Sequence, residues 1–324
     1  MTREALVSVV TPVYNGARYL GECIESVLNQ SYRNFEYVIL DNGSNDQTPQ
    51  ILAEFARRDA RIRVHRNIET LWVIDNWNRS LELISPDSRY CRILHADDAI
   101  YPDALATAVA LAERTPSIGI VGSLRLRGEH VECGGLPTGE EVFGGAEIAR
   151  LYLTGQVFAL APTSMLVRAD LVRARQPFYP RRYLHADLAA CFEILADNDF
   201  GFAHQVLSFS RKHADSITTT VAQRMQTILR EGLLMLQQYG PRYFPLDELA
   251  EIERATLRRY YRLLVRSVAT GRGREFLAYH LEGLREANRL PSIFDLCVAT
   301  IAELAESIAA PGKVFRHLRA RLRH

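Results

Sequence analysis

A histidine and two aspartates stand close together in one short segment of the chain, as His95, Asp97 and Asp98. Neighbouring carboxylates repel each other unless a proton or a cation lies between them. Carboxylate oxygens suit a hard cation such as Mg²⁺ or Mn²⁺, so Asp97 and Asp98 are candidate metal ligands. A plainer interpretation is that Asp98 or Asp103 only caps the helix that follows, because Asp is a common helix cap.

The residues on either side predict that this segment lies where a strand ends and a helix approaches. Residues 90–94 form a short apolar run typical of a buried strand, and an Ala- and Leu-rich helix is expected over 102–113. In an open α/β sheet, ligands bind at the carboxyl ends of the strands. We therefore expect the two carboxylates at the ligand-binding edge of a sheet.

Two more polar loops follow strands that we expect earlier in the chain. Residues 6–10 and 35–40 are apolar, β-branched runs, and they lead into the loops Thr11 to Gly16 and Asp41 to Asp46. Helical spacing of apolar residues follows each loop. Alternating strands and helices predict a parallel, doubly wound sheet, which would bring all three polar loops to one edge.

The remaining pattern predicts two regions, a catalytic domain over 1–215 and a helical region over 216–324. Residues 127–145 are rich in glycine and show no clear pattern, which is typical of an insertion or a mobile loop. Further elements are expected as strands over 61–65, 118–124, 164–167 and 201–210, and as helices beginning near Ile74 and Asp187. Another helix is expected after Thr48, which would be its N-cap with Pro49 at the first helical position.

Composition excludes several classes of protein. The chain is 48% hydrophobic and 24% charged, which is typical of a globular protein, and its net charge of +1 gives no reason to expect a nucleic-acid partner. Its five cysteines are widely spaced and form no C-x-x-C pair, which argues against a zinc site or a disulfide framework. We expect a cytoplasmic protein with no signal peptide and no membrane-spanning helix.

Several motifs, taken in order, resemble those of family 2 glycosyltransferases. The first strand with its Thr-Pro-Val-Tyr-Asn loop resembles the start of that family, and the resemblance extends over about residues 5–215. The motifs that carry it further are Asn29-Gln30-Ser31-Tyr32, Asp41-Asn42-Gly43-Ser44-Asn45-Asp46 (family pattern Asp-Asp-Gly-Ser-x-Asp), Asp97-Asp98 (metal-binding Asp-x-Asp region), Asp187 (Glu-Asp segment) and Arg211-Lys212-His213 (Tyr-Arg-x-His segment).

The resemblance implies a GT-A fold, a nucleoside-diphosphate sugar as donor, a Mn²⁺ or Mg²⁺ ion and inversion at the anomeric carbon. It implies transfer to a hydroxyl of a glycan or glycolipid acceptor, as in bacterial surface polysaccharide assembly. Asp98, with Asp97, would hold the metal, and Asp187 would be the catalytic base. The donor-binding residues that it implies are Thr11, Pro12, Tyr14, Asp41, Asn42, Asp97 and His213.

The sequence departs from the family pattern at three positions. Asn42 replaces an Asp that often accepts a hydrogen bond from uracil, so a uridine donor is expected while thymidine and guanosine stay open. An amide carbonyl can still accept that bond. His95 stands where many members carry a further Asp, and Ala186 replaces the Glu beside Asp187. His185 is a rival for the role of base, since an unperturbed imidazole titrates near neutral pH.

Two other classes of function remain as alternatives. A nucleotidyltransferase could use a similar sheet and metal, but the loop from Thr11 to Gly16 has one glycine and no lysine to bind phosphates. A non-catalytic nucleotide-sugar-binding protein is favoured only by Ala186. Trp77 and Asn78 are expected as core and helix-capping residues rather than as sugar contacts. Thr163 with Ser164 could face the acceptor or simply begin a strand.

The last residues of the chain form a basic amphipathic pattern. The basic residues are Lys313, Arg316, Arg319, Arg321 and Arg323, interspersed with Val314, Phe315, Leu318 and Leu322. This pattern suits the surface of an anionic bilayer, and self-association or a role in acceptor access are alternatives. A solvated terminal helix or a disordered tail would carry the same pattern.

Overall fold

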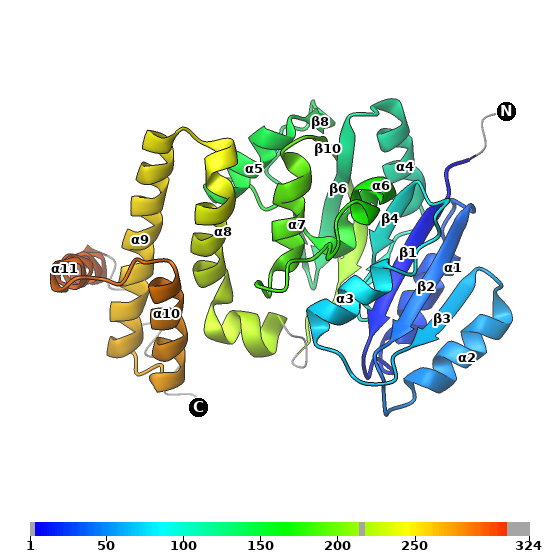
Figure 1. The fold of residues 1–324 in the computed structure, drawn as a ribbon, viewed down its shortest axis with the longest axis horizontal. Helices are drawn as coiled ribbons and strands as arrows, with labels where there is room; N and C mark the ends of the chain where they lie inside the picture. The colour runs from blue at the N-terminus through cyan, green and yellow to red at the C-terminus, as the bar shows by residue number, and fades with distance from the viewer. Residues whose placement is uncertain (1–3, 214–217, 310–324) are drawn as a thin grey trace. The chain divides into compact units, whose positions relative to one another are not determined.

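The computed structural model of the protein describes residues 4–213 and 218–309. The chain divides into two compact units, Met1–Ser216 and Ile217–His324. The first unit is built on one sheet with helices packed against it, and the second is helical in the part that the structure describes (Figure 1). The α/β fold class expected from the sequence, with a helical C-terminal region, is confirmed.

The sheet runs in the order β3-β2-β1-β4-β9-β6-β10-β5, with β7 paired to β6 and β8 paired to β10. The strands are β1 (Val7–Val13), β2 (Phe35–Asp41), β3 (Ile62–Arg66), β4 (Tyr90–Ile93), β5 (Ala99–Ile100), β6 (Ile118–Arg127), β7 (His130–Glu132), β8 (Val142–Phe143), β9 (Leu166–Arg168) and β10 (Asp199–Ser210). The helices of this unit are α1 (Leu20–Leu28), α2 (Thr48–Arg58), α3 (Val73–Leu81), α4 (Ala104–Arg114), α5 (Gly145–Leu153), α6 (Ala169–Arg173) and α7 (Ala186–Leu195), with a 3₁₀ turn η1 (Pro162–Ser164).

Strand β1 is buried on both faces, as its β-branched sequence predicts. Val7, Val9 and Val13 on one face join a hydrophobic core with side chains of α1, α2 and α4. The opposite face is covered by α3, which contacts β1 and β2. Helices on both faces therefore fix β1 at the centre of the long parallel part of the sheet.

The parallel pairing of β1 with β2 and with β4 brings the three predicted polar loops to one edge. The loop after β1 is bound directly to the loop after β2, since the Asn15 N–H donates to Ser44 Oγ at 2.9 Å. Helix α1 reaches the third loop, where Cys23 Sγ donates to the His95 carbonyl at 3.5 Å. The expected convergence of these loops is therefore present.

The structure departs from the sequence expectation in three places. Thr48 was expected as a helix cap, but it is the first residue of α2 and its Oγ1 accepts the Gly16 N–H at 2.9 Å. Residues 127–145 contain two strands: β7 folds back on β6 in a turn at Gly128, which has a φ of +58°, and β8 pairs with β10. Strands β5 and β9 run antiparallel to their neighbours, so the sheet is mixed at its short strands.

The second unit consists of a π-helical turn η2 (Thr218–Gln223) and four helices in its described part, α8 (Thr227–Tyr243), α9 (Leu246–Ala269), α10 (Arg274–Glu286) and α11 (Ile293–Ala309). Helix α9 contacts each of the other three helices. None of the helices in residues 4–213 and 218–309 is long and apolar enough to cross a bilayer. The basic pattern over residues 313–323 lies outside the described residues.

Candidate active site

Asp98 is nearly fully buried in the loop after β4, with 6% of its surface exposed. Its Oδ2 accepts hydrogen bonds from Thr163 Oγ1 at 2.5 Å and Ser210 Oγ at 2.9 Å. Its Oδ1 accepts the Arg211 N–H at 3.0 Å. Donors from η1 and from the end of β10 therefore hold the carboxylate in place.

The capping interpretation fails for Asp98, which lies before α4 and is bound elsewhere. Asp103 occupies the N-cap position of α4, which begins at Ala104, but its carboxylate makes no capping hydrogen bond and accepts one from Ser31 Oγ at 2.7 Å instead. Burial raises the pKa of Asp98 above its usual range, and the negative charge of Asp97 adds to that effect. A bound cation would offset both costs, because it favours the ionised carboxylate.

Asp97 is paired with the histidine of the predicted Arg-Lys-His segment. His213 Nε2 lies 2.9 Å from Asp97 Oδ2, and Arg211 Nε donates to the Asp97 carbonyl at 3.2 Å. The Arg211 guanidinium also forms an ion pair with Glu22 at 2.5 Å and lies over the ring of Tyr19 at 4.5 Å. These contacts join the end of β10 to the loop that carries the two aspartates.

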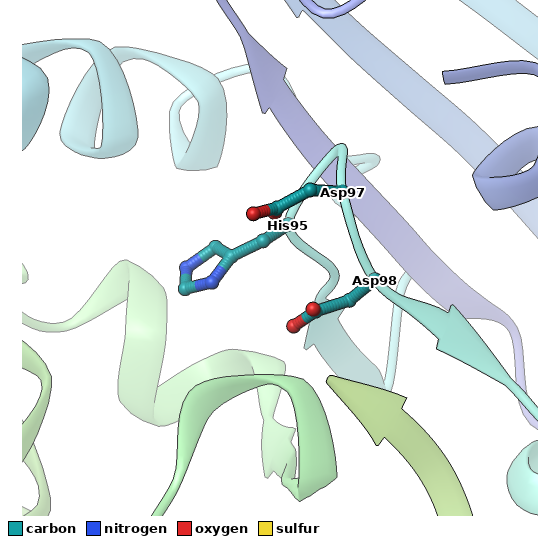
Figure 2. A group of neighbouring side chains, drawn as sticks. All are labelled: His95, Asp97 and Asp98. Carbon is teal, nitrogen blue, oxygen red and sulfur yellow. The ribbon is translucent and has the colours of Figure 1, made fainter. Parts of the chain in front are cut away.

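His95 completes a cluster with the two aspartates. One potential ligand atom from each of His95, Asp97 and Asp98 lies within 4.8 Å of the other two. Figure 2 shows the imidazole and both carboxylates leaving the loop toward the same space. The ring stacks on Trp77 with a centroid distance of 5.1 Å and an interplanar angle of 26°. Trp77, expected only as a core residue, therefore also orients a member of this cluster.

Asp187 lies in the first turn of α7, and His185 rather than Asp187 is the N-cap residue. Burial raises the pKa of Asp187, while the nearby charges of His185 and His95 oppose the rise. His95 also acts on the pKa of Asp98 in the same direction. Asp187 and Asp98 therefore share His95 as an electrostatic neighbour. Ala186, at the position of the family's Glu, has no exposed surface.

Asp41 and Asn42 at the end of β2 are both buried and both engaged within the protein. The Asp41 carboxylate accepts the Ser44 N–H at 2.9 Å and a bond from Arg66 Nη1 at 2.7 Å. Asn42 Oδ1 accepts from Asn67 Nδ2 at 2.8 Å and from the Leu71 N–H at 2.9 Å. Asn42 thus holds the segment that leads into α3, and it stays a prediction that its carbonyl accepts a hydrogen bond from the nucleoside base.

The loop predicted from Thr11 to Gly16 begins later than expected, because β1 continues to Val13. Thr11 and Pro12 are therefore buried strand residues, and Thr11 Oγ1 lies 3.0 Å from the hydroxyl of Tyr37. Tyr14 follows the strand and is 51% exposed, so its ring is available at the surface of the loop. Tyr14 can contact a ligand directly, whereas Thr11 and Pro12 support the loop from inside the sheet.

Three residues that contact the cluster or its neighbours Arg211 and His213 had no clear signal in the sequence. Ser210 and Tyr19 stand in unremarkable surroundings, and Thr163 could equally have begun a strand. Asn78, expected in the core, binds the backbone of Tyr179 through both its carbonyl and its amide, at 2.8 and 2.9 Å. That pair of bonds fixes α3, and with it Trp77, relative to the segment before α7.

The chain belongs to glycosyl transferase family 2, whose model matches residues 8–175. Among curated relatives, an uncharacterized glycosyltransferase of Haemophilus influenzae is 33% identical over 129 residues, covering 40% of this chain and 39% of the relative. A PGL/p-HBAD biosynthesis glycosyltransferase of Mycobacterium bovis is 32% identical over 133 residues, covering 40% and 51%. The matched segment thus spans about two fifths to one half of these relatives.

Two solved structures have similar folds at 16% sequence identity. Residues 1–349 of S. aureus TarS, in complex with UDP-GlcNAc, match with a TM-score of 0.66 over 89% of this chain and 82% of that one. The mannosyltransferase PcManGT from Pyrobaculum calidifontis, in complex with GDP-Man and Mn²⁺, matches with a TM-score of 0.58 over 98% and 85%. At this identity the likeness shows the GT-A fold alone.

Proposed function

We propose that this protein is an inverting glycosyltransferase that moves a sugar from a nucleoside-diphosphate sugar to a hydroxyl of a glycan or glycolipid. The observation that carries this proposal is the cluster of His95, Asp97 and Asp98 at the carboxyl edge of the parallel strands. Asp187 lies near enough to His95 for the charge of the imidazole to act on its pKa. Membership of the family and the nucleotide-sugar complexes of the two neighbours support it.

The residues of the cluster fit a divalent cation such as Mn²⁺ or Mg²⁺. Asp98 and Asp97 offer the oxygen ligands that such ions prefer, and the buried Asp98 carboxylate gains most from a nearby positive charge. A cation bound there would neutralise the charge that develops on the diphosphate as it leaves. His213, which lies against Asp97, would hold that carboxylate in place and face the phosphates.

The donor would lie over the loops after β1 and β2. The residues proposed to form the nucleoside side of the site are Thr11, Pro12, Tyr14, Asp41 and Asn42. Uridine is the first choice for the nucleoside, in line with the UDP-GlcNAc complex of the TarS neighbour. Guanosine, found in the PcManGT complex, and thymidine are the alternatives for the donor panel.

Asp187 is the proposed base. The acceptor oxygen forms a bond to the anomeric carbon from the face opposite the diphosphate, the bond from that carbon to the phosphate oxygen breaks, and the acceptor proton passes to the Asp187 carboxylate. Asp187 is half-buried, and a carboxylate with a raised pKa is a better proton acceptor than an ordinary one. The segment before α7, which includes the exposed Arg181 and Arg182, would offer a surface for the acceptor, whereas Thr163 and Ser164 of η1 are buried.

A panel of UDP, GDP and dTDP sugars, with release of the nucleoside diphosphate as the readout, tests this function. We expect release from one nucleoside class, with Mn²⁺ or Mg²⁺ required and excess chelator abolishing it. Full activity of metal-stripped protein in chelator would contradict the metal assignment. Release of pyrophosphate from a nucleoside triphosphate would indicate a nucleotidyltransferase, and binding without any turnover would indicate a non-catalytic sugar-nucleotide-binding protein.

We further propose that the C-terminal region contacts the surface of an anionic membrane, where a lipid-linked glycan acceptor would be found. One face of α11 exposes a run of apolar side chains, namely Ile293, Phe294, Val298, Ile301 and Leu304. The acids Glu303 and Glu306 are engaged by Arg262 of α9. The sequence continues from this helix into the basic residues 313–323, whose charge complements anionic lipid. A second copy of the chain is the competing occupant.

A further inference from the structure

The loop that carries the metal cluster contains a histidine where the family pattern has an acid, and the structure indicates what that histidine does. The Asp98 N–H donates to the His95 carbonyl at 3.0 Å, which closes a tight turn over residues 95–98. The turn brings the imidazole to the same side as the carboxylates of Asp97 and Asp98 (Figure 2). The sequence separation alone does not require this orientation.

The imidazole is held at this place by its surroundings. Trp77 stacks on one face of the ring, and the backbone carbonyl of His95 accepts a hydrogen bond from Cys23 Sγ. His95 Nε2 is buried and has no hydrogen-bond partner among the described residues. Leaving a buried polar nitrogen without a partner costs free energy, and a metal ion bound to Nε2 would recover it.

We propose that His95 is a third, nitrogen ligand of the cation held by Asp97 and Asp98, and that it biases the site toward Mn²⁺ and similar transition metals over Mg²⁺. This inference rests on the proposed function. Imidazole binds transition metals well, whereas Mg²⁺ prefers an all-oxygen shell. An Asp at position 95, as in the family pattern, would give an all-oxygen site. His95 would therefore change the choice of metal without changing the chemistry of transfer.

The competing ligand is the other histidine of the site. His213 Nε2 is already paired with Asp97 Oδ2 at 2.9 Å, which places it against a carboxylate that we assign to the metal. His213 belongs to the segment that resembles the family motif, whereas His95 stands where many members of the family carry an Asp. The two imidazoles can be distinguished by a spectroscopic measurement that detects nitrogen bound to the metal.

The test is pulsed EPR of Mn²⁺ bound to the full chain in the presence of UDP, and in parallel of GDP. Nitrogen bound to Mn²⁺ gives ¹⁴N modulation of the electron spin echo. We expect this modulation in the wild type and in His213→Phe, and its loss in His95→Phe, which keeps an aromatic ring against Trp77. Modulation that survives in His95→Phe and disappears in His213→Phe would overturn the proposal, as would its absence from the wild type.

A second variant measures the metal preference directly. His95→Asp restores an oxygen ligand, so the ratio of the Mg²⁺ to the Mn²⁺ dissociation constant should fall by about tenfold or more. An unchanged ratio would contradict the assignment. Mn²⁺ binding and ¹⁴N coupling together distinguish a failure of the proposed metal-dependent function from a failure of the proposed role of His95. If Mn²⁺ binds and Asp98→Asn abolishes that binding, but no ¹⁴N coupling is seen, only the role of His95 fails. If no Mn²⁺ binds with either nucleotide, the proposed metal-dependent function fails.

Discussion

The Thr163 hydroxyl donates a 2.5 Å hydrogen bond to the Asp98 carboxylate, although 65 residues separate the two in the sequence. Both side chains are almost completely buried. The Thr163 carbonyl in turn accepts a bond at 2.6 Å from Nη2 of Arg92, a fully buried arginine of β4. Two hydrogen bonds therefore link Asp98 through Thr163 to Arg92, which lies on β4 in the middle of the sheet.

Replacing Thr163 should show what that hydroxyl contributes. Thr163→Val keeps the shape of the side chain but leaves Asp98 with one donor fewer, so we expect transfer to fall by roughly tenfold as the carboxylate loses its fixed orientation. Thr163→Ser keeps the donor and should stay within a few-fold of wild type. The measurement is kcat/KM for nucleoside diphosphate release. Equal rates for the valine and serine variants would show that this bond does not position Asp98.

Asp98→Asn should separate activity from stability. Asn cannot carry the charge that binds a cation, so we expect turnover to be lost. Burial and Asp97 raise the pKa of Asp98, so the ionised carboxylate costs stability at neutral pH. The variant without metal should therefore melt at the same temperature as the wild type or higher. Asp103→Asn, at an exposed carboxylate, is the matched control and should keep full activity. A large drop in the melting temperature of Asp98→Asn would point to a structural role.

The convergence of the three polar loops could be predicted because each loop follows a strand of the parallel core. The apolar runs before Thr11, Asp41 and His95 indicate buried strands, and parallel strands end at one edge of a sheet. The burial of Asp98 could not be predicted in this way. Its donor Ser210 lies 112 residues away and arrives on β10, and no local pattern encodes that pairing.

The antiparallel strands and the stacked ring were also beyond the sequence. Strand β9 follows the turn η1 and lies between β4 and β6, antiparallel to β4. Thr163 belongs to this turn and is hydrogen-bonded to Asp98. The sequence predicts that Trp77 is a core residue, because it falls on the same face of a helix as Ile74 and Leu81. Only the packing of α3 against the loop after β4 shows that its ring faces His95. Such contacts depend on how the elements pack together, and the secondary-structure propensity of a segment does not determine that packing.

A buried histidine should make the helical unit sensitive to acid. His280 has no exposed surface, and its ring nitrogens lie 2.8 Å from the Tyr260 hydroxyl and from the Met225 carbonyl. Burial lowers the pKa of His280 to about 4, whereas an unfolded histidine titrates near 6.5. Below pH 6.5 the unfolded chain binds a proton that the folded chain does not, so stability is lost as the pH falls. The loss should be about 2 kcal/mol between pH 7 and pH 5.

Urea unfolding followed by circular dichroism at 222 nm would measure that loss. The fluorescence of Trp72 and Trp77, which both lie in the first unit, would report on the unfolding of that unit separately. His280→Met removes the titrating group, so its unfolding free energy should change less between pH 7 and pH 5 than that of the wild type. The same pH dependence in both proteins would assign it to other groups.

The exposed apolar face of α11 gives a test of membrane contact. We expect the full chain to sediment with vesicles that contain anionic lipid and to remain in solution with neutral vesicles. Replacing Phe294 and Ile301 by Ser should weaken sedimentation, as should removal of residues 312–324. Ile68→Ser, at an exposed apolar residue of the first unit, is the matched control. Equal sedimentation of the wild type and all variants would contradict membrane contact. If light scattering shows that the wild type is a dimer and that the Phe294 and Ile301 replacements make it a monomer, the face would be assigned to contact with a second copy.

Asp187→Asn is the sharpest test of the proposed base, because it keeps the size and a hydrogen-bond acceptor but removes basicity. If Asp187 takes the acceptor proton, transfer should fall by ~10²-fold or more, with donor affinity and melting temperature nearly unchanged. Burial raises the pKa of Asp187, and only its ionised form accepts a proton. The wild-type rate should therefore decline with falling pH, starting above the range in which an ordinary carboxylate titrates. If Asp187→Asn keeps both the wild-type rate and its decline at low pH, the role of base would be assigned to His185 instead.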